Sequence, residues 1–453
     1  MDTIHEPARD TPVCHECDIC VIGGSCTGVF AAIAAARLGA KVALVESLAY
    51  FGGTATASMV CVWHSRMDTV HQRPIYAGLT LEAVERLTKR NEVQDRGPND
   101  DMQFIFNPAA LAIELDRMVV EAGVRPFLHT RFVAAVMDGE GNVSAAIIED
   151  KTGRRAIKAR IFIDATGDGD LAHRAGLPTY KGPRLQPPTA CAIFQGLAQL
   201  PSDQRQNVLR GNVFDPKHPE ALRPGFLWGA TVPGRDLYMV AGTRVHGADC
   251  SDADQLTNAE IEGRRQIRAI HDIVRRCVGE GRDSVNLLAI PARIGIRQTR
   301  QVRCLHQLTQ AEVLSGQRFD DAIANGSYRV DVHAADGEGL VFRYLDGREV
   351  TIYADGRRTA ARWREPIASD PTFYQVPYRC LVPRGSRNVL VAGRCLDADE
   401  GAFGAVRVMV NCNQTGQAAG VAAKLALEGG TGVADVDTAR LREALSDQGA
   451  VVI

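Results

Sequence analysis

The residues best suited to chemistry lie in one short stretch, GGSCTG, at residues 23–28. They follow the spacing of G-x-G-x-x-G, with Ser25 at the middle glycine position. Gly23 would allow a tight bend, Gly28 would let a helix contact the preceding strand closely, and the helix amides would receive a pyrophosphate. Glu46, 23 residues after Gly23, is placed to bind a ribose hydroxyl. The pattern predicts a dinucleotide site, and the acid disfavours NADP.

Other candidate residues lie further along the chain. His64, in MVCVWHSRMD with Arg66, is a candidate proton carrier because imidazole titrates near neutral pH, and a local structural role fits it about equally well. Four arginines lie in PARIGIRQTRQVR: Arg293, Arg297, Arg300 and Arg303. They would bind a substrate carboxylate or compensate transferred charge, with interdomain salt bridges as the alternative. Asp331 and His333 are expected to have a structural role between domains.

The elements that must position these residues can be read from the apolar pattern. DICVIG, at 18–23, is typical of a buried parallel strand. After the turn, apolar residues recur at the spacing of one helix face: Val29, Ala32, Ile33 and Ala36. KVALVE then supplies a second strand after Gly39. This βαβ unit is the context that the glycine fingerprint requires, but alone it does not distinguish FAD from NAD.

Three later segments bear on the choice of dinucleotide. SLAYFGGTATAS, at 47–58, has a bare glycine backbone that can approach a bulky flat ligand. ARIFIDATGDGDLA, at 159–172, is an apolar strand that runs into small and polar residues. The stretch 388–427 predicts a last strand, a loop and a long alanine-rich helix whose N-terminal region follows Gly404.

Together these segments resemble the FAD-dependent oxidoreductase family related to fumarate reductase and succinate dehydrogenase flavoproteins, with the glutathione-reductase type of FAD fold. The resemblance extends from about Asp18 to Gly429 and includes PARIGIRQTRQVR. It implies an α/β fold: a Rossmann-like FAD-binding domain, with a parallel sheet and a small β-hairpin sheet, plus an inserted mixed α+β substrate domain. Many relatives have glycine, proline and alanine at Ser25, Cys26 and Thr27, which leaves the phosphate contacts open in detail.

The resemblance also implies which residues contact FAD. The adenosine and pyrophosphate would be held by Gly23, Ser25, Cys26, Thr27, Gly28, Glu46 and Ser47. The flavin and its ribityl chain would lie along Gly52, Gly53, Thr54 and Ala55. Adenine would contact the backbone of Val133. The strand-end motif beside the cofactor would be Ala165, Thr166, Gly167 and Asp168. The ribityl and pyrimidine side would be completed by Gly393, Arg394, Val406 and Arg407, with the positive end of the long helix directed at the pyrimidine.

The predicted domain organisation is discontinuous. The FAD-binding domain occupies residues 18–190 and resumes at 370–429. The substrate domain occupies 191–369 and would close over the flavin, bringing Arg293 and Arg297 opposite His64. Residues 430–453 form a short helical tail.

The expected activity is hydride exchange between a small organic substrate and tightly bound FAD. No second G-x-G-x-x-G follows a strand and opens a helix, and no C-x-x-x-x-C pair occurs, so a dedicated NAD(P)H site is not expected. Oxygen or a separate carrier would complete the cycle. The alternatives are an RNA-modifying flavoprotein, a flavin-dependent monooxygenase, and a flavin-bearing binding or sensor protein. Monooxygenases usually have Gly-Asp at the last strand, where this chain has Gly393 and Arg394.

Charge, targeting signals and cysteine spacing limit the classes of partner and the location expected for this protein. A formal net charge of −2 provides no global field to attract nucleic acid or an anionic membrane. The absence of a secretory signal and of any apolar run of roughly 18 residues predicts a cytoplasmic protein without a membrane span. Cys14, Cys17 and Cys20 superficially suggest an iron–sulfur run, but Cys20 falls in the first strand, so no metal is expected. A homo-oligomer is left open.

Overall fold

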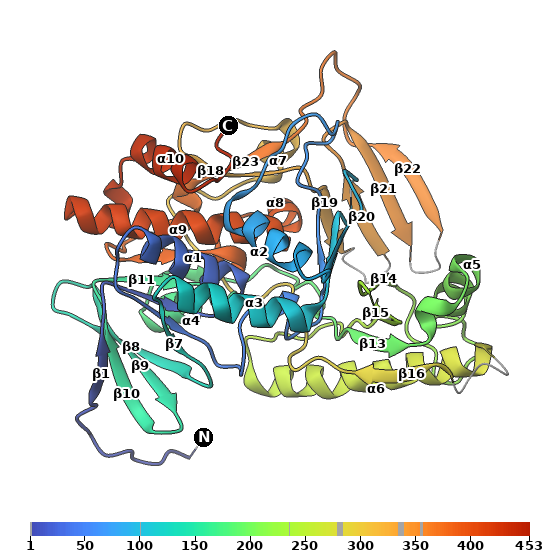
Figure 1. Cartoon of the computed structure of the whole chain (residues 1–453), viewed down its shortest axis with the longest axis horizontal. Helices are drawn as coiled ribbons and strands as arrows, with labels where there is room; N and C mark the ends of the chain where they lie inside the picture. Colours follow the sequence, from blue (N-terminus) through green and yellow to red (C-terminus); the bar gives the residue numbers. More distant parts are fainter. Residues whose placement is uncertain (1, 100, 235, 279–283, 334–338, 354–356) are drawn as a thin grey trace.

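A five-stranded parallel sheet lies at the centre of the part of the molecule that carries the GGSCTG turn (Figure 1). The computed structural model describes residues 2–99, 101–234, 236–278, 284–333, 339–353 and 357–453. The strand order is β24 (Val389–Val391), β11 (Ile161–Asp164), β2 (Ile19–Ile22), β3 (Val42–Val45) and β7 (Arg125–Phe127). Because every pairing is parallel, the carboxyl ends of these strands meet at one edge of the sheet. The predicted α/β fold class is confirmed.

The two faces of this sheet are covered differently because successive side chains alternate between them. In β2, Ile19 and Val21 pack in the helical core, whereas Cys20 and Ile22 pack against a second sheet. That sheet has the order β1 (Val13–Glu16), β10 (Gly153–Lys158), β9 (Val143–Asp150) and β8 (Arg131–Met137). It corresponds to the predicted small sheet of β-hairpins, and burial of Cys20 is confirmed.

Two helices, α1 (Cys26–Arg37) and α9 (Met409–Gly429), pack together on the other face. Their contact needs glycine in α9. A Cβ atom added at Gly416 would lie 2.1 Å from the carbonyl oxygen of Thr27. One added at Gly420 would lie 2.1 Å from the carbonyl oxygen of Ala31. This close approach fixes the N-terminal end of α1, which carries the GGSCTG turn.

The long C-terminal helix begins later than expected. A short helix, α8 (Glu400–Val406), contains Gly404, and α9 starts only at Met409. Val408 has extended backbone angles, φ −64° and ψ 145°, and this residue interrupts the helical path. The residues directly before α9 are therefore Arg407 and Val408.

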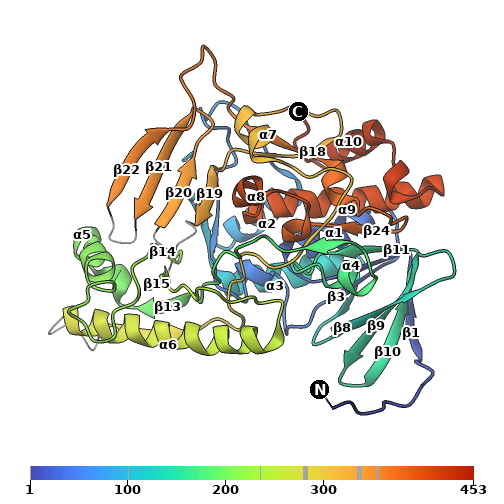
Figure 2. The same cartoon turned by 180° about the vertical axis from the view of Figure 1, so that it is seen from behind.

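The mid-chain region forms two further sheets at the opposite end of the molecule from the β1/β8–β10 sheet (Figures 1 and 2). One has the order β14 (Trp228–Thr231), β15 (Leu237–Ala241), β13 (Ala192–Gln195) and β16 (Asn286–Ala289). It shares an apolar core with α6 (Ala253–Val278). The other has the order β19 (Val330–His333), β20 (Gly339–Arg343), β21 (Arg348–Tyr353) and β22 (Arg358–Arg362).

Smaller elements complete the described structure. The remaining α-helices are α2 (Gly78–Thr88), α3 (Pro108–Glu121), α4 (Asp170–Arg174), α5 (Ser202–Gln206), α7 (Gln310–Ser315) and α10 (Thr438–Asp447). Three smaller sheets contain the remaining strands. One has the order β4 (Val62–Trp63), β6 (Phe104–Phe106) and β5 (Val93–Asp95). The other two pair β12 (Thr179–Tyr180) with β17 (Gln301–Val302), and β18 (Ala322–Gly326) with β23 (Tyr374–Pro377). None of the helices within the described ranges combines the length and apolar character that crossing a bilayer would need.

Candidate functional site

A cavity of about 1060 Å³ joins the edge of the parallel sheet to the mid-chain region. Its walls include Gly23, Glu46 and Ala165, which follow β2, β3 and β11. They also include Arg244 and His333 from the two mid-chain sheets. The space is therefore shared by the predicted dinucleotide site and the predicted substrate side.

The turn between β2 and α1 has no room for side chains at its two outer glycines. Gly23 has φ 102°, and a Cβ atom there would lie 2.5 Å from the carbonyl oxygen of Ala165. At Gly28 a Cβ atom would lie 1.8 Å from the carbonyl oxygen of Gly23. Ser25 precedes α1 without capping it through its side chain, and the first turn of α1 contains no acid. The amides at the N-terminus of α1, and the positive end of its dipole, therefore remain available to an anion in the cavity.

Glu46 is held in place by three donors. Its Oε2 accepts a 2.7 Å hydrogen bond from the amide of Gly24. Its Oε1 accepts bonds from the amide of Leu48 at 2.8 Å and from the Ser47 hydroxyl at 3.0 Å. Because each carboxylate oxygen can accept more than one bond, Glu46 retains capacity for a hydroxyl donor in the cavity.

The second glycine pair lies against the first turn. Gly52 and Gly53 have φ values of 108° and 53°, which favour glycine. A Cβ atom at Gly53 would lie 2.8 Å from the Cβ atom of Ser25. Both glycines and Thr54 line the cavity, which leaves a flat backbone wall beside the first turn.

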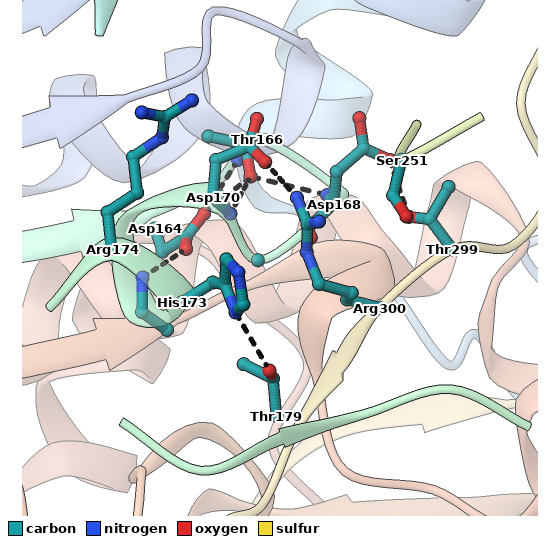
Figure 3. A network of polar contacts seen from close by, with 12 residues as sticks. Asp164, Thr166, Asp168, Asp170, His173, Arg174, Thr179, Ser251, Thr299 and Arg300 are labelled. Atoms are coloured by element: carbon teal, nitrogen blue, oxygen red, sulfur yellow. Dashed lines mark hydrogen bonds and ion pairs between the residues drawn. The ribbon is translucent and has the colours of Figure 1, made fainter. Parts of the chain in front are cut away.

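The end of β11 is tied to the mid-chain arginine segment through Asp168 (Figure 3). The Thr299 hydroxyl donates to Asp168 Oδ1 at 2.7 Å, and Arg293 donates to Oδ2 at 3.1 Å. Arg394 pairs with the same carboxylate at 3.5 Å. Arg300 donates to the Asp168 carbonyl oxygen at 3.1 Å. Arg293 thus lines the cavity and also forms an ion pair between the mid-chain segment and the end of β11. An interdomain salt bridge of this kind was the alternative predicted for it from the sequence.

Asp164, at the last position of β11, is a buried acid within the same network. It accepts hydrogen bonds from the Thr166 hydroxyl at 2.7 Å and the Ala172 amide at 3.0 Å. Burial nevertheless raises its pKa to about 6. This carboxyl group therefore holds the chain at the end of β11 in place through its hydrogen bonds, and it does not line the cavity.

His64 lies at the mid-chain end of the cavity and packs edge-on against the Tyr328 ring, with centroids 4.4 Å apart. Burial lowers its pKa to about 4, so the imidazole is neutral at physiological pH. Its carbonyl oxygen accepts from Tyr76 at 2.7 Å, and its Nδ1 has no hydrogen-bond partner within the described structure. The imidazole is therefore neutral, and protein atoms enclose its Nδ1.

Arg297 and Arg407 lie at the same end of the cavity with different partners. Arg297 donates to the Pro187 carbonyl oxygen and to Thr189 Oγ1, both at 2.5 Å. Arg407 donates to Asp331 Oδ2 at 3.0 Å, and the Tyr328 hydroxyl donates to the same oxygen at 3.0 Å. Asp331 therefore orients a cavity arginine, beyond the structural role expected from the sequence.

The structure brings most of the predicted site residues to this cavity. Those that line it are Gly23, Ser25, Cys26, Thr27, Glu46, Ser47, Gly52, Gly53, Thr54, His64, Ala165, Thr166, Gly167, Asp168, Arg293, Arg297, Gly393, Arg394 and Arg407. Those that do not are Gly28, Ala55, Val133 and Val406. Gly28 instead contacts the Gly23 carbonyl oxygen on the protein side of the turn. The Val133 carbonyl oxygen accepts a hydrogen bond from Arg174. Arg66 and Arg303 also lie outside the lining.

Several cavity residues were not predicted: Arg174, Trp228, Arg244, Tyr328 and Phe342. No motif marks them, because each comes from a different element and only the tertiary fold brings them together. Among the described residues, no group of His, Cys, Asp and Glu side chains has the geometry of a metal site, and this includes the Cys14–Cys20 run.

Comparison with known proteins gives a family and several structural likenesses. The family model described as FAD dependent oxidoreductase matches residues 18–445. No curated protein matches the chain. Similar solved structures include a geranylgeranyl bacteriochlorophyll reductase-like protein from Thermoplasma acidophilum, with 11% identity, TM-score 0.47, and coverage of 95% of this chain and 83% of that one. The myxobacterial chondrochloren halogenase CndH has 14% identity, TM-score 0.47, and coverage of 96% and 80%.

Proposed function

The chain belongs to the family of FAD-dependent oxidoreductases, and from this premise we propose that it exchanges a hydride between a small organic substrate and its FAD, without a dedicated NAD(P)H site. The observation that carries the proposal is the single cavity shared by the β2–α1 turn and the mid-chain sheets. A substrate on the mid-chain walls would lie in the same enclosed space as the cofactor. A closer kinship with fumarate reductase flavoproteins is part of the proposal and rests on the motifs at residues 23–28 and 165–168.

The residues present fit FAD. Gly23 and Gly28, where a Cβ atom would clash with backbone, allow the tight turn before α1, and the N-terminus of α1, which no side chain caps, offers amides to a pyrophosphate. Glu46 would bind the adenosine ribose, while Gly52 and Gly53 present a bare wall to a flat ring. When bound, FAD supplies the two-electron chemistry of hydride exchange.

The chain's own residues supply a proton acceptor and positive charge. Oxidation of an alcohol or amine carbon releases a proton together with the hydride, and the neutral imidazole of His64, which lines the cavity, would accept it. Tyr328 packs against this imidazole and limits its rotation. Arg297 and Arg407 place positive charge in the cavity, which would stabilise negative charge developing there.

Anaerobic spectroscopy of the purified holoenzyme tests this proposal. A panel of alcohols, amines and acids is mixed with the enzyme, and loss of visible flavin absorbance is followed; at least one class should bleach the flavin. NADH and NADPH, added separately, should leave the spectrum unchanged over the same time. Rapid bleaching by either nucleotide would contradict the proposal and favour a reductase or a monooxygenase.

A further inference from the structure

Two arginines converge on one hydroxyl group in the mid-chain wall of the cavity. Arg244, three residues after the end of β15, donates to Thr189 Oγ1 at 2.9 Å and to the Thr243 carbonyl oxygen at 2.6 Å. Arg297 donates to the same Thr189 oxygen and to a carbonyl oxygen of Pro187. All these acceptors are neutral, so two guanidinium groups lie close together, and no carboxylate of the described residues is bound to either.

The surroundings do not balance this positive charge. Within the described residues, the carboxylate that acts electrostatically on both arginines is Asp331, and it is already bound by Arg407. Burial raises the pKa of the nearby Cys191 thiol to about 12, so this group is uncharged. Burial, followed by repulsion from neighbouring arginines, lowers the pKa of His333 well below its ordinary value, so it is neutral as well.

The pKa values of both arginines are lowered in these surroundings. Burial lowers the pKa of Arg244 to about 10, and burial together with Arg244 and Arg407 lowers that of Arg297 well below its ordinary value. In addition, the Nε atoms of Arg244 and Arg407 are buried donors without a partner in the described structure. Buried cations are normally paired, so this part of the wall favours a ligand that carries negative charge.

An apolar surface lies beside this cationic pair. In the antiparallel pairing of β19 and β20, Asp331 lies opposite Phe342 and His333 lies opposite Leu340, so all four side chains share one face of the sheet. Phe342 and Leu340 belong to an apolar cluster that Phe226 packs against. From the other mid-chain sheet, Trp228 pairs across from Ala241, three residues before Arg244, and also lines the cavity.

We propose that the substrate is a carboxylic acid with an aromatic or similarly bulky apolar body. Its carboxylate would bind Arg244 and Arg297, whose planar guanidinium groups suit bidentate recognition of a carboxylate. Its apolar body would lie against Trp228, Phe226 and Phe342. This inference rests on the proposed function in placing the ligand in the cavity that FAD shares, and it adds the substrate class.

Titration of the oxidised holoenzyme with unreactive ligands tests the substrate class without turnover. Benzoate should perturb the visible flavin spectrum saturably and raise the melting temperature. Benzamide, which has the same shape without the charge, should bind about 30-fold more weakly or worse, because it leaves the cation pair uncompensated. Acetate, which has the charge without the ring, should also bind more weakly than benzoate.

Variants locate the site. Arg244→Gln and Arg297→Gln should each lose most of the preference for benzoate over benzamide. Arg205→Gln is the matched control, because Arg205 is a mid-chain arginine that lies over the Tyr238 ring, 4.7 Å from its centroid, and outside the cavity lining. It should bind benzoate like the wild type. If the two cavity variants do not fold, the comparison of benzoate with benzamide in the wild type still decides.

Equal affinity for benzoate and benzamide in the wild type would overturn the proposal. So would a lack of saturable binding by benzoate and by the larger naphthoate, in which case the cations would serve the negative charge of the reduced cofactor instead. Failure of the proposed function is separate: bleaching by NADPH would refute hydride transfer from the organic substrate yet leave the benzoate titration unchanged.

Discussion

Replacement of Gly28 by alanine should weaken FAD binding roughly 100-fold. The added Cβ atom would lie 1.8 Å from the Gly23 carbonyl oxygen, whereas an ordinary contact begins near 3.4 Å, so about 1.6 Å must be gained. Helix α1 cannot move back by this distance, because the Thr27 backbone already touches α9 at Gly416. The cost should therefore reach the upper part of the usual overpacking range, about 3 kcal/mol. If it falls on the bound state, this corresponds to roughly a 100-fold weaker affinity.

The assay is fluorescence titration of FAD into apoprotein, combined with thermal unfolding of the same samples. Gly139→Ala is the matched control, because no atom lies within 4 Å of a Cβ atom built at this glycine and its φ is not positive. Ser25→Gly should also retain FAD, since it restores the commoner fingerprint. Wild-type affinity and melting temperature in Gly28→Ala would refute the argument that this contact shapes the turn.

Two further predictions concern His64 and the contact between α1 and α9. Because burial lowers the pKa of His64 from 6.5 to about 4, the unfolded chain binds more protons between these values, and this residue's contribution to stability is lost as the pH falls through that window. Urea unfolding at several pH values should therefore show a shallower acid-induced loss for His64→Gln than for the wild type, and parallel curves would contradict the assignment. In Gly420→Ala the Cβ atom would lie 2.1 Å from the Ala31 carbonyl oxygen, so thermal unfolding should show a loss of about 1–3 kcal/mol. An unchanged melting temperature would show that the helices separate at little cost.

The FAD-side half of the site could be predicted because its information is local. The strand, turn and helix from Asp18 to Arg37 follow from apolar spacing and two glycines whose positions admit no side chain. Glu46 could be found because it directly follows the next strand. In each case the sequence signal lies within about thirty positions, the length of one βαβ unit, although the atom that excludes a side chain at Gly23 belongs to the distant Ala165.

The substrate side could not be predicted because its residues come from separate sheets. Arg244 follows β15, Tyr328 precedes β19, and His64 follows β4. Their spacing along the chain has no period to recognise. The start of α9 was missed for a different reason: the stretch around Arg407 is apolar and alanine-rich enough for a helix, and only the extended angles of Val408 separate α8 from α9.

Arg293 and Arg297 illustrate what sequence spacing leaves undecided. They lie four residues apart in one segment, and from sequence both were candidates for the same task. Arg293 meets Asp168, so most of its charge is neutralised by the protein and it helps to join the two halves. Among the described residues Arg297 bonds to Thr189 and a carbonyl oxygen and to no carboxylate, so no ion pair neutralises its charge there. Because a buried cation without a counter-ion is costly, the arginine that the fold leaves unpaired is the one that selects an anionic ligand.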